Sequence, residues 1–396
     1  MSARQPSADV VVVGAGVIGA ACACALSAAG LRVTILERDG LAAGTSRACQ
    51  SGIGFGLDMD DYELAWSLAS NQAYRDLAAQ GADIDYVPCG ALIVDEPGEE
   101  ERLKLLIRRA QKLGADCRWV SRSDLIDLEP EIAPDLDGGA LLPGVAHVSP
   151  MKVVRELINR AVRAGANVLT GTELLGIDAF SGRVRGAITR SGYIATPKLV
   201  LAAGVWSKGI CTRIGLDIPL RPLKGHVIVT EPLDGLVRHY VSEAGYGPSA
   251  ASYRFDPMDG AEPAPSEPAV ATVIQSLPSG SLLIGSSREF AGFDRDVNRQ
   301  TVTTIAGRAR RFVPALGDVT VLRVYAGLRP LVADGRPLVG TTAHCEGLIF
   351  ATGHGGDGNT GALMTGSVIA DLVCGHEPAF DVSPLAPDRF RLSGRS

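Results

Sequence analysis

The sequence predicts a mixed α/β fold, in which a Rossmann-like dinucleotide-binding domain is interleaved with an antiparallel-sheet domain. Three observations lead to this prediction. Residues 10–19 read as a buried strand, a glycine turn and the start of a small-residue helix. Two hydrophobic segments much later in the chain, 198–206 and 348–359, also run from a strand into a glycine turn. The region between these segments is mainly a meander of short strands.

The N-terminal segment has the full context of a dinucleotide-binding βαβ unit. Gly14, Gly16 and Gly19 follow the first strand in GxGxxG spacing, and a second strand at 31–36 leads to Glu37. Gly14 permits the tight turn, Gly16 lets the backbone approach a pyrophosphate, and Gly19 lets the helix pack closely on the sheet. The pyrophosphate is expected at the helix N-terminus, where free N–H groups and the helix dipole favour anions. We expect Glu37 to accept hydrogen bonds from the adenosine ribose hydroxyls.

The other elements follow from their hydrophobic periodicity. A segment rich in Pro, Gly and acidic residues at 246–268 is expected to be a surface loop that covers the substrate pocket and sets specificity. The tail after Pro384 has no periodicity and is expected to be a loosely attached end. Strands are predicted within 84–95, 167–202, 220–230, 271–276, 282–286, 319–328 and 348–352, and helices at 62–77, 99–113, from 150 to about 161, 206–214, 302–312 and 359–373.

Composition excludes several classes of protein. The chain has 396 residues, of which 46% are hydrophobic and 21% charged, as in an ordinary globular protein with a large core. A net charge of -6 gives no basic footprint for nucleic acid. The uncharged run between Asp9 and Arg32 has phosphate-loop glycine spacing, so we interpret it as strand plus helix rather than a membrane span. Residues 1–9 contain no secretory signal, and the location is expected to be cytoplasmic.

The cysteines predict reduced thiols rather than a metal centre. Eight cysteines are scattered along the chain, and none forms a CxxC pair. This spacing does not predict a metal or iron–sulfur cluster site. Free thiols are typical of a reducing compartment.

The order of the segments favours FAD over NAD. An NAD-type domain would continue at once with more strand–helix units, whereas here residues 44–47 follow Glu37 directly and a β region comes later. In an FAD fold, distant segments return to complete the nucleotide domain, as 198–206 and 348–359 are expected to do. We predict an FAD-binding domain made of 1–85, 140–218 and 327–396, and a substrate domain made of 86–139 and 219–326.

Seven segments occur in order along the chain: GAGVIG, GTSRACQSGIGFG, HVSP, VLAAGVWS, LRPLKGHVIVTEP, YAGLRPLVADGRPLVG and ATGHGGDGNTGALMTG. Because of these seven segments, the chain resembles the D-amino-acid oxidase, glycine oxidase and sarcosine oxidase family of FAD enzymes. The resemblance covers nearly the whole chain. Within that family, SGIGFGLDMDDYELAW and VPCGALIVDEPGEEERL are similar to the flavin subunits of D-hydroxyproline dehydrogenases and opine oxidases.

The resemblance implies oxidation of the C–N bond of a small amino or imino acid by hydride transfer to flavin N5. The imine product would hydrolyse to an oxo acid. Sarcosine oxidases that hold FAD covalently have a cysteine in the segment matching YAGLRP, and this chain has none there, so the FAD is expected to be non-covalent. Monomeric sarcosine oxidases also place a lysine near the flavin for oxygen activation, and the matching strand here offers Leu283.

Three readings of the function stay open. In the first reading the chain is itself the amino or imino acid oxidoreductase, and electrons leave the reduced flavin either to oxygen or to another carrier. The chain is alternatively the flavin β subunit of a hetero-oligomeric opine or D-hydroxyproline dehydrogenase, which passes electrons to a partner. In the third reading it is a non-catalytic flavin-binding interaction subunit.

The resemblance also implies the site residues. Arg329 matches the glycine oxidase arginine that clamps the substrate carboxylate, against the alternative of a structural arginine that ties the strand end to a loop. His354 either contacts the isoalloxazine or is a structural histidine, while backbone N–H groups beside it approach the flavin. Thr45 and Ser46 either bind the pyrophosphate or cap a turn, and Arg47 adds charge there or is solvated. The predicted cofactor-binding residues are Gly14, Gly16, Val17, Ile18, Gly19, Glu37, Arg38, Thr45, Ser46, Arg47, Ala203, Gly204, Trp206, Arg329, Gly353, Gly355, Gly356, Asp357, Gly358 and Asn359.

Overall fold

The computed structural model describes residues 7–94, 98–233, 235–246, 253–256, 268–390 and 392. Most of the expected surface loop at 246–268 therefore lies outside the described residues. Within them, no helix is both long and apolar enough to cross a bilayer.

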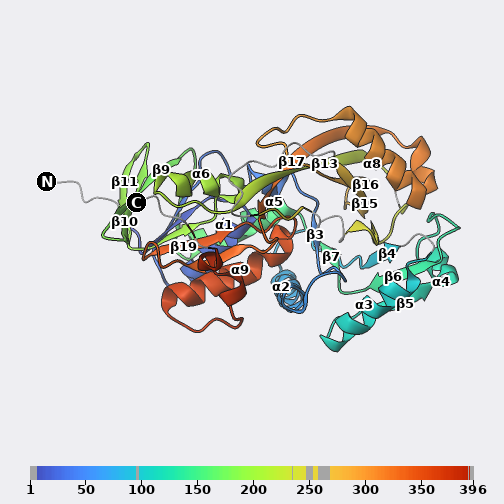
Figure 1. Cartoon of the computed structure of the whole chain (residues 1–396), viewed down its shortest axis with the longest axis horizontal. Helices are drawn as coiled ribbons and strands as arrows, with labels where there is room; N and C mark the ends of the chain where they lie inside the picture. The colour runs from blue at the N-terminus through green and yellow to red at the C-terminus, as the bar shows by residue number, and fades with distance from the viewer. Residues whose placement is uncertain are drawn as a thin grey trace.

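A six-stranded, mainly parallel sheet forms the first layer (Figure 1). Its central strand β1 consists of four buried valines, the continuous apolar run that a parallel strand covered on both faces requires. β1 pairs in parallel with β2 and β12, and β18 joins the far edge antiparallel to β19. The strands, in spatial order, are β18 (Leu338–Thr341), β19 (Leu348–Thr352), β12 (Leu199–Leu201), β1 (Val10–Val13), β2 (Val33–Leu36) and β8 (Asn167–Leu169).

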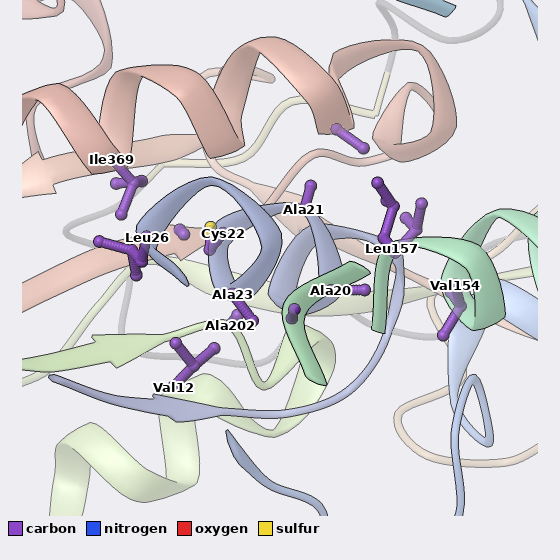
Figure 2. Close-up of a cluster of buried hydrophobic side chains, with 14 of the residues drawn as sticks. Val12, Ala20, Ala21, Cys22, Ala23, Leu26, Val154, Leu157, Ala202 and Ile369 are labelled. Carbon is purple, nitrogen blue, oxygen red and sulfur yellow. The ribbon is translucent and has the colours of Figure 1, made fainter. Parts of the chain in front are cut away.

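Helices α1 (Val17–Ala28), α5 (Pro150–Arg163) and α9 (Gly358–Cys374) pack together in a core that includes strand β1. Figure 2 shows the alanines of α1 in the middle of this cluster, with Leu157 of α5 and Ile369 of α9 around them. A Cβ added at Gly366 would lie 2.6 Å from the Ala21 carbonyl oxygen, so α9 and α1 approach backbone to backbone. Small residues in α1 are what make this close packing possible.

The parallel sheet also contributes to a second core, shared with a small antiparallel sheet. Leu199 and Leu201 of β12 and Phe350 of β19 are fully buried in this core. The small sheet has the strand order β11, β10, β9, and helix α6 follows the strand β12. The bounds are β9 (Leu174–Phe180), β10 (Arg183–Thr189), β11 (Gly192–Ala195) and α6 (Ser207–Arg213).

An eight-stranded sheet forms the second half of the molecule, on the right of Figure 1. Its neighbours are antiparallel except for β14 and β4, which are parallel. Its spatial order is β17 (Val321–Val332), β13 (Leu220–Pro232), β16 (Ser281–Arg288), β15 (Ala269–Ser276), β14 (Tyr240–Glu243), β4 (Ala91–Val94), β6 (Gly138–Leu142) and β5 (Arg118–Ser121). The two sheets confirm the predicted mixed α/β class.

Four further α-helices, a two-stranded sheet and several short 3₁₀ helices complete the described structure. Helix α2 starts with a capping box, in which Asp60 accepts from the Glu63 backbone N–H and the Glu63 side chain accepts from that of Asp60. The amphipathic helices α3 and α8 bury their apolar faces in the cores of the larger sheet. The bounds are α2 (Asp61–Ala79), α3 (Glu100–Lys112), α4 (Arg122–Leu128), α8 (Arg299–Phe312), β3 (Gly52–Ile53) and β7 (Ala146–His147).

The expectation of a loosely attached C-terminal tail is wrong for its described residues, 385–390 and 392. Arg389 donates to Asp334 Oδ2 at 2.8 Å, and Asp388 accepts from the Thr342 hydroxyl at 2.6 Å. Leu385 and Leu392 are each only 3% exposed. Short 3₁₀ turns held by polar contacts have no helical or strand periodicity, so the sequence pattern gave no sign of this attachment.

The domain boundaries stay a prediction. Strand β17 runs across the expected boundary between 326 and 327, and β6 runs across the one between 139 and 140. Each of these strands is a continuous member of the eight-stranded sheet.

Candidate active site

A cavity of about 800 Å³ lies where the two large sheets meet. It is lined by the glycine loop after β1, by the turn after β12, and by the turn between β19 and α9. Residues of β13, β14, β16 and β17 line it from the eight-stranded sheet. The site therefore joins the carboxyl ends of parallel strands, where α/β sheets bind ligands, to an antiparallel sheet that supplies charged side chains.

The glycine loop has the geometry that its spacing predicts. Gly14 has a φ of +101°, and its N–H donates to the Leu36 carbonyl at 2.7 Å. A Cβ at Gly14 would lie 2.6 Å from the Ala202 carbonyl oxygen, and one at Gly19 would overlap the Gly14 carbonyl oxygen. A side chain at either position would therefore push α1 away from the sheet.

Glu37 holds the loop in place through its carboxylate. Its Oε2 accepts from the Ala15 N–H at 2.8 Å, and its Oε1 accepts from the Asp39 N–H at 2.8 Å. A carboxylate has further lone pairs, so these bonds leave acceptor capacity for ribose hydroxyls. Glu37 lines the cavity, and its predicted contact with the ribose stays a prediction.

Ser46 and Thr45 connect the following turn to the rest of the site. Ser46 Oγ accepts from the Val17 N–H at 3.0 Å, so Ser46 caps α1 from outside the helix. The Ser46 hydroxyl proton is then available to a ligand at the helix N-terminus. Thr45 donates its hydroxyl proton to the Leu328 carbonyl at 2.7 Å and so ties this turn to β17.

The structure separates the two predicted arginines of this region. Arg38 lines the cavity, and its Cζ lies 4.7 Å from the centroid of the Trp206 ring. Trp206, Ala203 and Gly204 line the cavity beside it. Arg47 is exposed and is not among the described residues that line the cavity.

The turn from β19 to α9 brings His354 to the cavity wall. His354 is 7% exposed, and its Nε2 lies 2.9 Å from the Thr365 hydroxyl. Burial lowers the pKa of His354 to about 3, so the ring is neutral at physiological pH. The next residues line the cavity, and the Gly355 N–H donates to the Pro330 carbonyl at 2.9 Å. Asn359 Nδ2 donates to the Gln50 carbonyl at 3.0 Å.

Arg329 reaches the cavity from β17. Its Nη1 donates to the Ser287 carbonyl at 3.0 Å and its Nη2 to the Ser286 hydroxyl at 2.6 Å. The guanidinium lies against Gly225, where a side chain would overlap it. Among the described residues, no carboxylate forms an ion pair with Arg329, although burial lowers its pKa. A partly buried cation with neutral partners and unused N–H donors is suited to an anionic ligand.

Two further residues that line the cavity, Arg288 and Tyr240, were not predicted from the sequence. Arg288 is 3% exposed, and its guanidinium lies 4.3 Å from the centroid of the Tyr246 ring. A charged residue at the end of the fully buried strand β16 was a usable signal. Tyr240 packs against Gly52, where a Cβ would lie 2.9 Å from the ring, and burial raises the pKa of its hydroxyl. No local pattern marks Tyr240, because it is placed by the parallel pairing of β14 with β4.

A model of the family described as FAD dependent oxidoreductase (DAO) matches residues 9–372. The glycine oxidase of Pseudomonas aeruginosa is 30% identical over 397 residues, covering 96% of this chain and 99% of that protein. D-amino acid dehydrogenase 2 of Mesorhizobium japonicum is 28% identical, covering 94% of this chain and 98% of that protein. The crystal structure of glycine oxidase from Geobacillus kaustophilus superposes with a TM-score of 0.84 at 27% identity, covering 98% of this chain and all of that one.

Proposed function

The chain belongs to the DAO family of FAD dependent oxidoreductases, and on that premise we propose that it oxidises the C–N bond of a small amino or imino acid. FAD, when bound, supplies a two-electron acceptor at N5 for a hydride from the substrate α-carbon. Loss of that hydride turns the neutral amine into a protonated imine, which water hydrolyses to an oxo acid with release of the nitrogen as ammonium or an amine. The protein has to bind the acid, orient its α-carbon and exclude competing reactions.

The residues of this chain fit FAD. Gly14 and Gly19 leave no space for side chains, which brings the start of α1 close to the strand ends. The Ser46 hydroxyl and the first N–H groups of α1 suit the pyrophosphate, and Glu37 suits the ribose. We assign the backbone around Gly355 and Gly358 to the flavin ring, because the α9 N-terminus favours negative charge there.

Arg329 is the observation that supports the substrate class. It lines the same cavity as the glycine loop, with two neutral hydrogen-bond partners and no ion pair among the described residues. A guanidinium binds a carboxylate through two parallel hydrogen bonds, each charge-assisted bond contributing about 1.5–3 kcal/mol. We therefore assign Arg329 as the clamp for the substrate carboxylate. His354 is a weaker candidate for chemistry, since its ring bonds to Thr365.

The relatives named above support an amino acid substrate and leave the electron acceptor open. One is named an oxidase and another a dehydrogenase. We propose oxygen or a partner protein as acceptor, and the two are separated by the test below. A non-catalytic flavin-binding subunit is the reading that Arg329 disfavours, because such a subunit needs no carboxylate clamp.

The FAD is proposed to be non-covalent. No cysteine stands beside Arg329 on β17, and Cys345 is 6% exposed within a hydrophobic core. Heat-denatured protein is expected to release its flavin into the supernatant. Flavin that stays with the precipitated protein would contradict this.

The test is an anaerobic absorbance titration of the purified holoenzyme. Glycine, sarcosine, D-amino acids, hydroxyprolines and opines are added one at a time, with acetate as the control that lacks an amine. One class is expected to bleach the flavin, and acetate is expected to shift the spectrum without bleaching it. Rapid reoxidation on admitting air would identify an oxidase, and slow reoxidation a dehydrogenase. A flavin that no amine reduces would overturn the proposed function.

A further inference from the structure

Asp357 is a carboxylate in the cavity with no assigned partner. It occupies the N-cap position of α9, but its side chain makes none of the capping hydrogen bonds that Asp usually accepts there. No hydrogen bond or ion pair engages this carboxylate among the described residues. The side chain lines the cavity and is accessible from it.

Every other acidic residue that lines the cavity has a partner. The Glu37 and Glu63 carboxylates accept hydrogen bonds from backbone N–H groups. Four other carboxylates form ion pairs with arginines other than Arg329. These partnered residues are Glu37, Glu63, Asp39, Asp58, Glu173 and Glu243. Asp357 is therefore the cavity carboxylate that the described structure leaves available to a ligand.

The surroundings of Asp357 place it beside the proposed clamp. The Gly355 N–H bonds to the carbonyl of Pro330, the residue after Arg329, and a Cβ at Gly356 would lie 3.9 Å from Arg329 Cδ. The loop that carries Asp357 thus runs along the strand that carries Arg329. The charged and titratable groups that face Asp357 are Glu63 of α2, Arg288 of β16, Arg329 of β17 and Tyr240 of β14.

We propose that Asp357 contacts the amino group of the substrate and takes one proton from it. This inference rests on the proposed function, with the substrate carboxylate on Arg329. The step breaks one N–H bond of the substrate ammonium and forms one O–H bond on Asp357. It leaves a neutral amine, whose nitrogen lone pair assists departure of the α-hydrogen as hydride to the cofactor. The proton then passes from Asp357 to water.

Electrostatic interactions bring the pKa of Asp357 and the pKa of the substrate ammonium group closer together. Burial by the surrounding protein, followed by the negative charge of Glu63, raises the pKa of Asp357 to about 6, although Arg288 and Arg329 act in the opposite direction. The same two arginines lower the pKa of an ammonium ion bound between them. Asp357 is ionised above about pH 6 and is then able to accept the proton.

The test compares wild type with Asp357→Asn, using the amine that bleaches the flavin in the titration above. In the wild type, kcat/KM is expected to fall as the pH drops through about 6, because Asp357 becomes protonated. In Asp357→Asn, kcat/KM at pH 8 is expected to fall about 100-fold, and the decrease near pH 6 should disappear. Asp58→Asn is the matched control, because Asp58 lines the same cavity but pairs with Arg102.

Binding provides a second measurement. Asp357→Asn removes a negative charge near Arg329, so acetate, a carboxylate without an amine, should bind more tightly by flavin spectral titration. A merely structural role would weaken acetate binding and FAD retention together and would keep the decrease near pH 6. A wild type that no amine bleaches overturns the proposed function and this inference with it. If an amine bleaches the wild-type flavin but Asp357→Asn has the same kcat/KM and the same pH dependence as wild type, this inference alone is overturned.

Discussion

The two parts of the cavity wall are built in different ways. In the glycine-loop part, Ala15 bonds to Glu37 over 22 residues and Val17 to Ser46 over 29. In the part that carries Arg329, the guanidinium bonds to a serine 43 residues away, and Asn359 bonds to a backbone carbonyl 309 residues away. The first part depends on close backbone packing around the βαβ unit, with Ala202 after β12 against Gly14. The second depends on charged side chains that sheet register brings together.

Because of this difference, mutations in the two parts are expected to impair different steps, cofactor binding in one and substrate binding in the other. A side chain at Gly14 or Gly19 should remove the cofactor, because neither position has space for it. A change among the charged side chains should alter substrate handling and leave the cofactor in place. Mutations in the two parts therefore test the comparison directly.

The largest effect is expected for Gly14→Val. The new Cβ would lie within 2.6 Å of the Ala202 carbonyl, at a φ of +101° that β-branched residues avoid. The purified protein is expected to carry almost no flavin, measured as the ratio of visible to ultraviolet absorbance. Gly30→Ala is the control, because Gly30 also has a positive φ but its added Cβ meets nothing within 4 Å. Stoichiometric FAD in Gly14→Val would refute the role of the loop.

Arg329→Ala is expected to show the opposite pattern. Loss of one or more charge-assisted hydrogen bonds of about 1.5–3 kcal/mol should raise the substrate KM by about 10- to 100-fold. FAD content should not change. Arg323→Ala, an exposed position on the same strand, serves as the control. Unchanged steady-state kinetics in Arg329→Ala would remove Arg329 from the site.

His354 tests whether the charged part of the wall includes a titrating histidine. Its folded-state pKa is lowered to about 3, so its contribution to stability is present above the unfolded pKa of about 6.5 and is lost as the pH falls below it. Between pH 7.5 and 5.5, wild type should lose about 1.4 kcal/mol more unfolding free energy than His354→Gln. Urea unfolding of both holoproteins at the two pH values measures this. Equal losses would mean that His354 titrates normally in the folded protein.

Ser46→Ala should give the smallest effect. It leaves the Val17 N–H without its acceptor and is expected to reduce the free energy of unfolding by about 1 kcal/mol. FAD should remain bound but dissociate faster on dilution. Thr45→Val is the comparison, since Thr45 bonds to β17 rather than to α1. A Ser46→Ala protein as stable as wild type would show that the helix cap contributes nothing.

The βαβ unit, the tight packing at its glycines Gly14 and Gly19, and the return of two later segments to the same sheet could all be predicted from the sequence. The resemblance of its motif also pointed to Arg329, whose role as a carboxylate clamp stays a prediction. These features depend on backbone conformation and short apolar runs, which are encoded by neighbouring residues. The strand order β19, β12, β1, β2 agrees with this prediction of the sheet.

Which charged groups share the cavity depends on contacts between distant segments and could not be predicted from the sequence. Arg288 and Tyr240 face it because of strand register, and the Asp357 side chain is available because it does not cap its own helix. The anchored tail likewise depends on contacts with Asp334 and Thr342. A sequence pattern specifies local conformation and which face is apolar, whereas the pairing of distant strands selects which side chains meet.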